Sequence, residues 1–372
     1  MKLRENEEFY NGLNNDELEK ILGKAPTKLY YKFNDYKYNT QSKERILSGI
    51  KKLDYMLKGF ELGCITLWSG TTNAGKSTLL TLITRETIKQ GNKVFFFNGE
   101  QTKDDFKNNL YKASVNNIND LVRVPYKDSN IVDWYVNDKK AKELDKLYGE
   151  NLIVYNNNMA RDIDTLLLAM TQVHENLGVK CYILDNFMQI DIEGDNIYQE
   201  QTKIMEKLRT FAVNNQVHIH LVAHPRKIEN FQVRLSLYDV AGTMNIPNKA
   251  YNIISIIRVS NIVEKSFEYK KLRLDMAKAG YDMLKCDGIL EVLKTKGNEN
   301  GLVGLIFDTD KRTFYLAESL VGEKKDELIR SIQIEYENTK SKNNMPFWSE
   351  SMLKIDFYTW VDKLLYLDIK VS

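Results

Sequence analysis

The chain of 372 residues carries a formal net charge of +2, with 43% hydrophobic and 28% charged residues. This balance is typical of a globular protein with a substantial core and excludes a largely disordered chain. A protein that coats nucleic acid by bulk charge is far more basic, so any contact with DNA or RNA has to come from a local patch. Three widely spaced cysteines make no metal-ligand pattern. With no signal peptide and no apolar run of about 18 residues, we expect a cytoplasmic protein without a membrane segment.

Composition divides the chain into three predicted parts. Residues 1–45 are polar and contain one short predicted helix at 15–22 with a single apolar stripe. We expect this part to be an arm or linker, which either hangs free or lays its stripe on a neighbouring subunit. Residues 46–320 form the predicted core. Residues 321–372 are charged and predict a helical tail.

Short apolar segments alternate with helical patterns through the predicted core. Seven of them read as strands, at 64–68, 93–97, 180–184, 218–223, 253–257, 290–294 and 304–307. Because these segments are apolar almost without interruption, both faces of the sheet are expected to be covered by helices. The pattern predicts an α/β fold with a mostly parallel central sheet.

The strongest motif is a phosphate-binding loop at residues 70–77, which satisfies the pattern GxxxxGK[ST]. It follows the predicted strand at 64–68 and opens a predicted helix at 77–89, as the motif requires. Its backbone N–H groups and the helix N-terminus favour phosphate, Lys76 reaches the β- and γ-phosphates, and Ser77 binds Mg²⁺. The motif therefore predicts ATP and Mg²⁺ as ligands. The residues expected around the nucleotide are Gly70, Thr71, Thr72, Asn73, Ala74, Gly75, Lys76, Ser77 and Thr78.

Two carboxylates follow predicted strands in the order that an ATP hydrolase requires. Asp185 ends the strand at 180–184, where it is expected to hold Mg²⁺ beside Ser77. Glu100 comes shortly after the strand at 93–97, where a carboxylate polarises the attacking water. Lys76, Asp185 and Glu100 are therefore predicted catalytic residues.

From residue 46 to 316 the sequence resembles the RecA-like hexameric replicative DNA helicases of the DnaB-like and Twinkle-like group. The resemblance is carried by residues 48–63 before the phosphate-binding loop, by the segments around Glu100 and Asp185, and by residues 220–227. It implies a RecA-like P-loop NTPase core that assembles into a ring, as a homo-oligomer and expected hexamer. Such a ring translocates on single-stranded DNA, unwinds duplex at the replication fork, and hydrolyses ATP at subunit interfaces.

The resemblance also implies roles for residues at later strand ends. His224 corresponds to the sensor of the γ-phosphate, and Arg258 to an arginine finger that enters the ATP site of the next subunit. Arg226, Lys227 and Arg234 lie in the loop that lines the DNA channel in this family, although the chain has Ala241 where members often carry another arginine. Residues 294–297 are similar to a basic strand-end motif, whose role is either structural or near the neighbour's nucleotide.

Two other functions remain open on the sequence. A RecA- or RadA-type recombinase forms filaments and pairs DNA strands, whereas a KaiC-like ATPase hydrolyses ATP without coupling to DNA. No zinc-binding cysteines and no primase domain precede the predicted core. The resemblance therefore implies a helicase core that works with a separate primase, polymerase or loader, in a bacterial cell or a phage-infected host.

Overall fold

The computed structural model describes residues 32–35, 43–125, 132–192, 196–226, 234–240, 245–262 and 267–342. The chain divides into two compact units, Met1–Lys43 and Glu44–Ser372. The described part of the first unit contains a short 3-10 helix, η1 (Phe33–Asp35), and the helix predicted at 15–22 lies outside the described residues. The second unit carries the sheet, the phosphate-binding loop and the other described elements.

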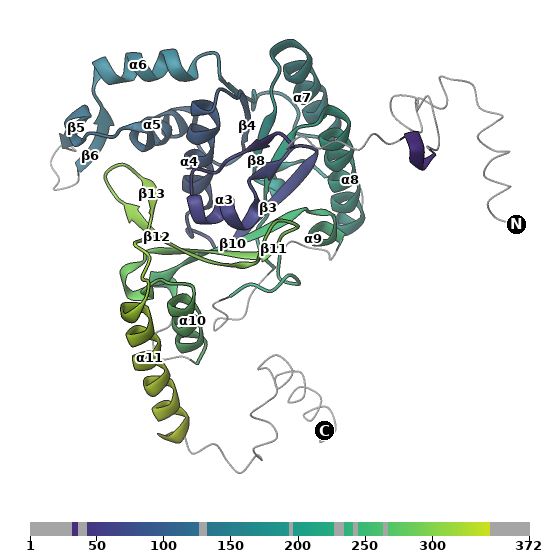
Figure 1. Ribbon diagram of the computed structural model, residues 1–372. Helices are drawn as coiled ribbons and strands as arrows, with labels where there is room; N and C mark the ends of the chain where they lie inside the picture. Colours follow the sequence, from purple (N-terminus) through teal and green to yellow (C-terminus); the bar gives the residue numbers. More distant parts are fainter. Residues whose placement is uncertain are drawn as a thin grey trace, which may run out of the picture. The chain divides into compact units, whose positions relative to one another are not determined.

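A nine-stranded sheet forms the centre of this unit, in the order β13-β12-β11-β10-β3-β9-β8-β4-β7 (Figure 1). From β10 to β7 all neighbouring strands pair in parallel, and β10 to β13 pair antiparallel. The carboxyl ends of six strands therefore meet at one edge. The strands are β3 (Cys64–Gly70), β4 (Val94–Asn98), β7 (Leu152–Val154), β8 (Cys181–Asp185), β9 (His218–Val222), β10 (Asn252–Arg258), β11 (Gly288–Lys294), β12 (Gly301–Asp308) and β13 (Thr313–Leu316).

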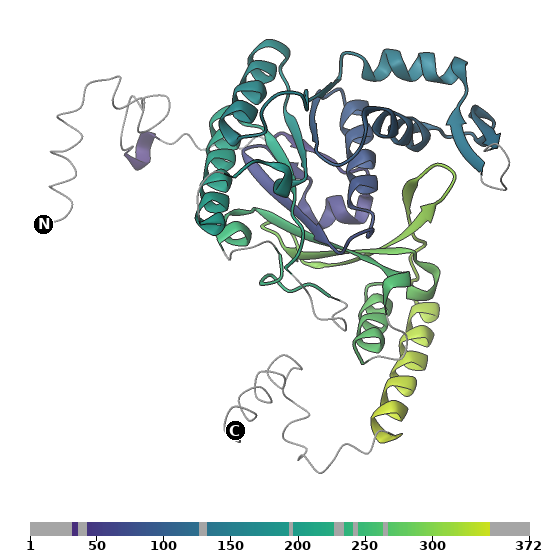
Figure 2. The same ribbon diagram turned by 180° about the vertical axis from the view of Figure 1, so that it is seen from behind.

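Alternate residues of the central strands pack into two separate cores. On β3, Ile65 and Leu67 join a core with α7 (Ile163–Leu177) and α8 (Ile197–Asn215). Trp68 lies in the other core, which includes α4 (Lys76–Lys89) and α5 (Lys103–Ser114). The teal helices α7 and α8 are seen along one face of the sheet in Figure 2. Burial on both faces explains the uninterrupted apolar strands and confirms the predicted mostly parallel α/β fold.

Several elements lie around the sheet that the sequence pattern did not predict. A hairpin of β5 (Leu121–Pro125) and β6 (Val132–Val136) packs beside α5, and its outer residues are partly exposed (Figure 1). Helices α10 and α11 pack together after the last parallel strand. The remaining elements are β1 (Arg45–Ile46), α3 (Lys51–Leu57), β2 (Phe60–Glu61), α6 (Asp138–Tyr148), α9 (Asn245–Lys249), α10 (Phe267–Lys278) and α11 (Glu323–Lys342). None of the described helices is long and apolar enough to span a membrane.

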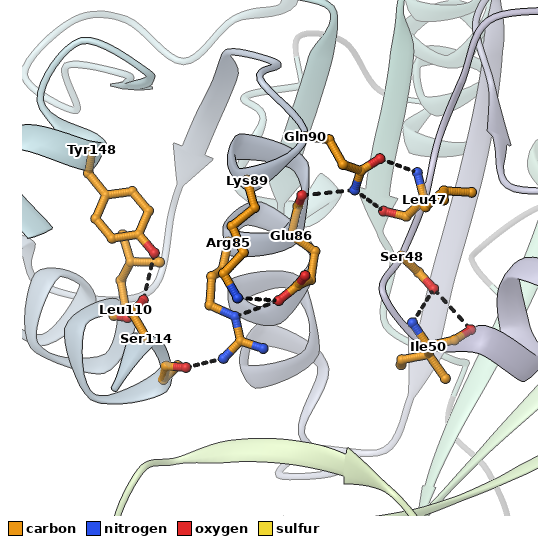
Figure 3. A network of polar contacts seen from close by, with 11 residues as sticks. Leu47, Ser48, Ile50, Arg85, Glu86, Lys89, Gln90, Leu110, Ser114 and Tyr148 are labelled. Atoms are coloured by element: carbon orange, nitrogen blue, oxygen red, sulfur yellow. Dashed lines mark hydrogen bonds and ion pairs between the residues drawn. The ribbon is translucent and has the colours of Figure 1, made fainter. Parts of the chain in front are cut away.

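Polar contacts tie the far end of α4 to its surroundings (Figure 3). The side-chain amide of Gln90 accepts a hydrogen bond from the backbone N–H of Leu47 and donates one to the Leu47 carbonyl oxygen, both at 2.9 Å. Glu86 forms ion pairs with Arg85 and Lys89. The helix that follows the phosphate-binding loop is therefore fixed at its C-terminal end, so its N-terminal end has a defined position.

Candidate nucleotide-binding site

The phosphate-binding loop connects the end of β3 to the start of α4, and two of its positions accept glycine alone. Gly70 has φ +152°, and a Cβ there would lie 2.5 Å from the carbonyl oxygen of Ile256. Gly75 has φ +99°, and a Cβ there would lie 2.7 Å from Cζ of Phe314. Gly75 also provides no side-chain cap for α4. The first N–H groups of the helix are therefore available to an anion.

The ammonium group of Lys76 lies across this loop. Its Nζ donates hydrogen bonds to the carbonyl oxygens of Gly70 at 2.8 Å and Thr71 at 2.9 Å. Burial lowers the pKa of Lys76, and the negative charges of Asp185 and Glu100 oppose this effect. The structure thus places the lysine and both predicted carboxylates in one electrostatic environment.

Asp185 ends β8 and is buried, at 2% exposure. Burial raises the pKa of its carboxyl group, while a hydrogen bond with the Ser77 side chain and the nearby Lys76 lower it. Its Oδ1 has no hydrogen-bond partner within the described part of the chain. A buried carboxylate oxygen without a partner, beside a serine hydroxyl, is a donor set that fits Mg²⁺.

A larger protein cage for a metal ion is absent from the described residues, because no group of three or more His, Cys, Asp or Glu side chains is placed to hold one. This agrees with a nucleotide-bound Mg²⁺, which takes one or two protein ligands and completes its octahedron with phosphate oxygens and water.

Three strand ends bring Glu100, Asn186 and His224 together. Glu100 follows β4, Asn186 follows β8 and His224 follows β9, and these strands are parallel neighbours. Nδ2 of Asn186 donates a hydrogen bond to Oε1 of Glu100 and lies 3.0 Å from Nε2 of His224. Oε1 of Glu100 and Nε2 of His224 are 3.4 Å apart. Asn186 has no role predicted from the sequence; its position directly after Asp185, on the strand between the other two, was the available signal.

Arg258 lies at the same edge, on its own chain's phosphate-binding loop. It ends β10, which pairs in parallel with β3, and its Nη1 donates to the carbonyl oxygen of Asn73 at 3.4 Å. The resemblance implied that Arg258 reaches into the next subunit. The structure corrects this placement, because parallel pairing carries the ends of β3 and β10 to one place.

The residues expected to contact DNA have different surroundings. Arg226 is exposed after β9, and Lys227 lies outside the described residues. Arg234 forms ion pairs with Glu291 on β11 and Asp275 on α10. These carboxylates raise the pKa of Arg234 and fix its guanidinium within the protein, at 26% side-chain exposure. The prediction that Arg234 binds DNA is therefore wrong for this geometry.

The basic segment at residues 294–297 lies at the opposite edge, because β11 runs antiparallel to β10. Nζ of Lys294 donates to the carbonyl oxygens of Pro247, Asn248 and Ala250 at the end of α9, which makes Lys294 structural. Lys296 is exposed, with its Nζ 5.5 Å from the centre of the Tyr251 ring.

Comparison with known proteins identifies this architecture. A family model described as an AAA domain matches residues 34–230. None of the curated proteins matches the chain. The solved ATPase domain of a DnaB-like helicase superimposes with a TM-score of 0.58 at 15% identity, covering 74% of this chain and 92% of that one.

Two further solved structures are similar. A DnaB-like replicative helicase, described with its interactions with primase, has a TM-score of 0.56 at 15% identity, covering 82% of this chain and 66% of that one. The KaiC-like protein PH0186 from Pyrococcus horikoshii OT3 has a TM-score of 0.50 at 14% identity, covering 74% of this chain and 100% of that one. At these identities the likeness demonstrates a shared fold, and it confirms the RecA-like core expected from the sequence.

Proposed function

Because the chain belongs to the AAA domain family and has the fold of DnaB-like helicase ATPase domains, we propose that it is a ring-forming ATP hydrolase that moves along single-stranded DNA and unwinds duplex. The observation that carries this proposal is the meeting of Lys76, Asp185, Glu100 and His224 at the edge of the sheet where the phosphate-binding loop lies. A phosphate cradle with a buried carboxylate and a second, accessible carboxylate is the equipment of a nucleotide hydrolase.

Each of these groups has a distinct task in hydrolysis. Lys76 binds the β- and γ-phosphate oxygens in exchange for the loop carbonyls that it now contacts. Ser77 and Asp185 hold Mg²⁺, which neutralises phosphate charge when bound. Glu100 is more exposed than Asp185, with 43% of its side chain accessible, and accepts the proton of the attacking water. Burial thus separates the two carboxylates into a metal ligand and a general base.

Arg258 stabilises the phosphates from within the same chain in this proposal, since its guanidinium already lies on the phosphate-binding loop. A cation that enters the neighbouring subunit has to project from a surface away from its own loop. Lys296 meets this requirement, because it is exposed at the opposite edge of the sheet. We therefore assign Arg258 to its own ATP site and Lys296 to the site of the next subunit in the ring.

Coupling to DNA runs from the nucleotide through His224 into the loop that follows β9. His224 lies beside Glu100 at the start of this loop, and Arg226 follows two residues later. Cations such as Arg226 and Lys227 track the phosphates of a single strand without reading its sequence. A homohexamer around the strand, served by a separate primase, polymerase or loader, is the assembly that this arrangement supports.

Steady-state ATP hydrolysis with and without single-stranded DNA tests the proposal. We expect DNA to stimulate the wild type and Lys76→Ala to abolish both basal and stimulated rates. Lys89→Ala, at the exposed C-terminal end of the same helix, is the matched control and is expected to behave as wild type. A rate that depends on Lys76 but not on DNA would instead support a KaiC-like ATPase, the alternative favoured by the similarity to PH0186. Electron micrographs then separate closed rings from recombinase-like filaments.

A further inference from the structure

Asn186 occupies the centre of the site and is buried, at 1% exposure. Its Nδ2 carries two hydrogens, and two groups lie within their reach: Oε1 of Glu100 and Nε2 of His224. Glu100 and His224 come from strands on either side of β8. The amide of Asn186 is therefore a bridge between the two flanking strand ends.

The orientation of this amide is fixed by the backbone. Oδ1 of Asn186 accepts a hydrogen bond from the N–H of Met188 at 2.9 Å and so caps the short helix η3 (Phe187–Gln189). Exchange of the oxygen and nitrogen positions would place Nδ2 against an N–H donor, and Oδ1 against a carboxylate. Nδ2 therefore has to face Glu100 and His224.

This orientation determines what the neighbours do. An amide nitrogen donates and does not accept, so Nε2 of His224 is the acceptor in its contact with Asn186. The ring hydrogen of a neutral His224 then resides on Nδ1. One oxygen of Glu100 is occupied by the same amide. The three side chains form a single unit in which a displacement of His224 pulls on the donor that holds Glu100.

We propose that Asn186 is a positioning residue that fixes Glu100 and transmits the movement of His224 to it. The inference rests on the proposed role of Glu100 as the general base and adds a path between that base and the loop after β9. In this arrangement the loop, which begins at His224, is two hydrogen bonds away from the carboxylate that activates water. The loop and the hydrolytic step are thereby mechanically connected.

Three substitutions separate this bridge from the helix cap. Asn186→Ser keeps an oxygen that can cap η3 and removes the donor that reaches Glu100 and His224. Asn186→Asp keeps the shape and the cap and also removes the donor, whereas Asn186→Ala removes both. We expect all three to lower kcat about ten- to a hundredfold, the loss typical of a hydrogen bond to a charged group.

Nucleotide affinity distinguishes positioning from damage to the fold. Fluorescent ATP-analogue binding should stay within about twofold of wild type in Asn186→Ser, because Asn186 does not belong to the phosphate-binding loop. Asn117 is the matched control, since it caps η2 (Ile118–Asp120) in the same way on the exposed surface. Asn117→Ser should retain wild-type kcat. Wild-type kcat in both Asn186→Ser and Asn186→Asp would overturn the proposal, because the cap alone would then account for Asn186.

A double-mutant cycle with His224→Ala tests the coupling. If Asn186 acts through the unit, the double variant Asn186→Ser/His224→Ala should be about as slow as the slower single variant. Multiplied effects would show that the two residues act independently and would overturn the transmission. These measurements need no DNA, so a wild-type ATPase that ignores DNA would reject the helicase function while the cycle still decides the role of Asn186.

Discussion

Acid is expected to weaken the fold through a buried histidine on β9. His218 is fully buried, with Nδ1 2.7 Å from the carbonyl oxygen of Glu61 and Nε2 3.0 Å from Oγ1 of Thr66. Burial lowers the pKa of His218 from 6.5 to about 4, and burial also lowers the pKa of the adjacent His220. The folded protein therefore holds His218 neutral at a pH where an exposed histidine takes up a proton.

The sign of the effect follows from proton binding. Between pH 6.5 and 4 the unfolded chain binds a proton at His218 that the folded chain does not, so stability falls as the pH decreases through this window. The difference between the two pKa values corresponds to a loss of about 2 kcal/mol on going from pH 7 to pH 5. His218→Gln cannot titrate and should lose about 2 kcal/mol less than the wild type over the same interval.

Urea unfolding of both proteins at pH 7 and pH 5 measures this quantity. The substitution itself is expected to lower stability at pH 7, since a glutamine does not fill the histidine site, and the comparison therefore uses the change with pH in each protein. A difference in stability between wild type and His218→Gln that is equal at both pH values would refute the reasoning.

Three further outcomes follow from the site. Gly75→Ala should lower ATP affinity more than tenfold in binding titrations, because a Cβ would meet Phe314 at 2.7 Å on a backbone with positive φ; unchanged affinity would mean that the loop relaxes freely. Arg234→Ala should destabilise the protein by about 2 kcal/mol in urea, since it leaves two partly buried carboxylates unpaired, and an unaltered midpoint would contradict that. Mixed rings of Lys76→Ala and Arg258→Ala subunits should remain inactive in ATP hydrolysis, whereas recovered activity on mixing would show that Arg258 acts on the next subunit.

Local patterns were sufficient to predict most of the fold. The central strands are buried on both faces, so their apolar runs stand out, and the phosphate-binding loop is specified by glycines that no other residue can replace at two positions. The hairpin β5–β6 was missed because its outer residues are partly exposed and no continuous apolar run marks it. Strand β7 has only three residues.

The errors in the site concern partners that are distant in sequence. Arg234 looks like a loop cation, yet its carboxylates are 41 and 57 residues away. Arg258 was assigned by resemblance to the next subunit, and only the strand order places it beside β3. Asn186 carries no chemical signature of its own, and its importance arises from the parallel neighbours that deliver Glu100 and His224.

Strand separation on a forked DNA duplex tests the central claim most directly. The wild type should release the labelled strand in the presence of ATP and Mg²⁺. Glu100→Gln should bind ATP and single-stranded DNA but leave the fork intact, because it retains the phosphate-binding loop and lacks the base that activates water. A wild type that hydrolyses ATP rapidly and separates no strands, on forks of either polarity, would contradict the account of a DNA-unwinding motor.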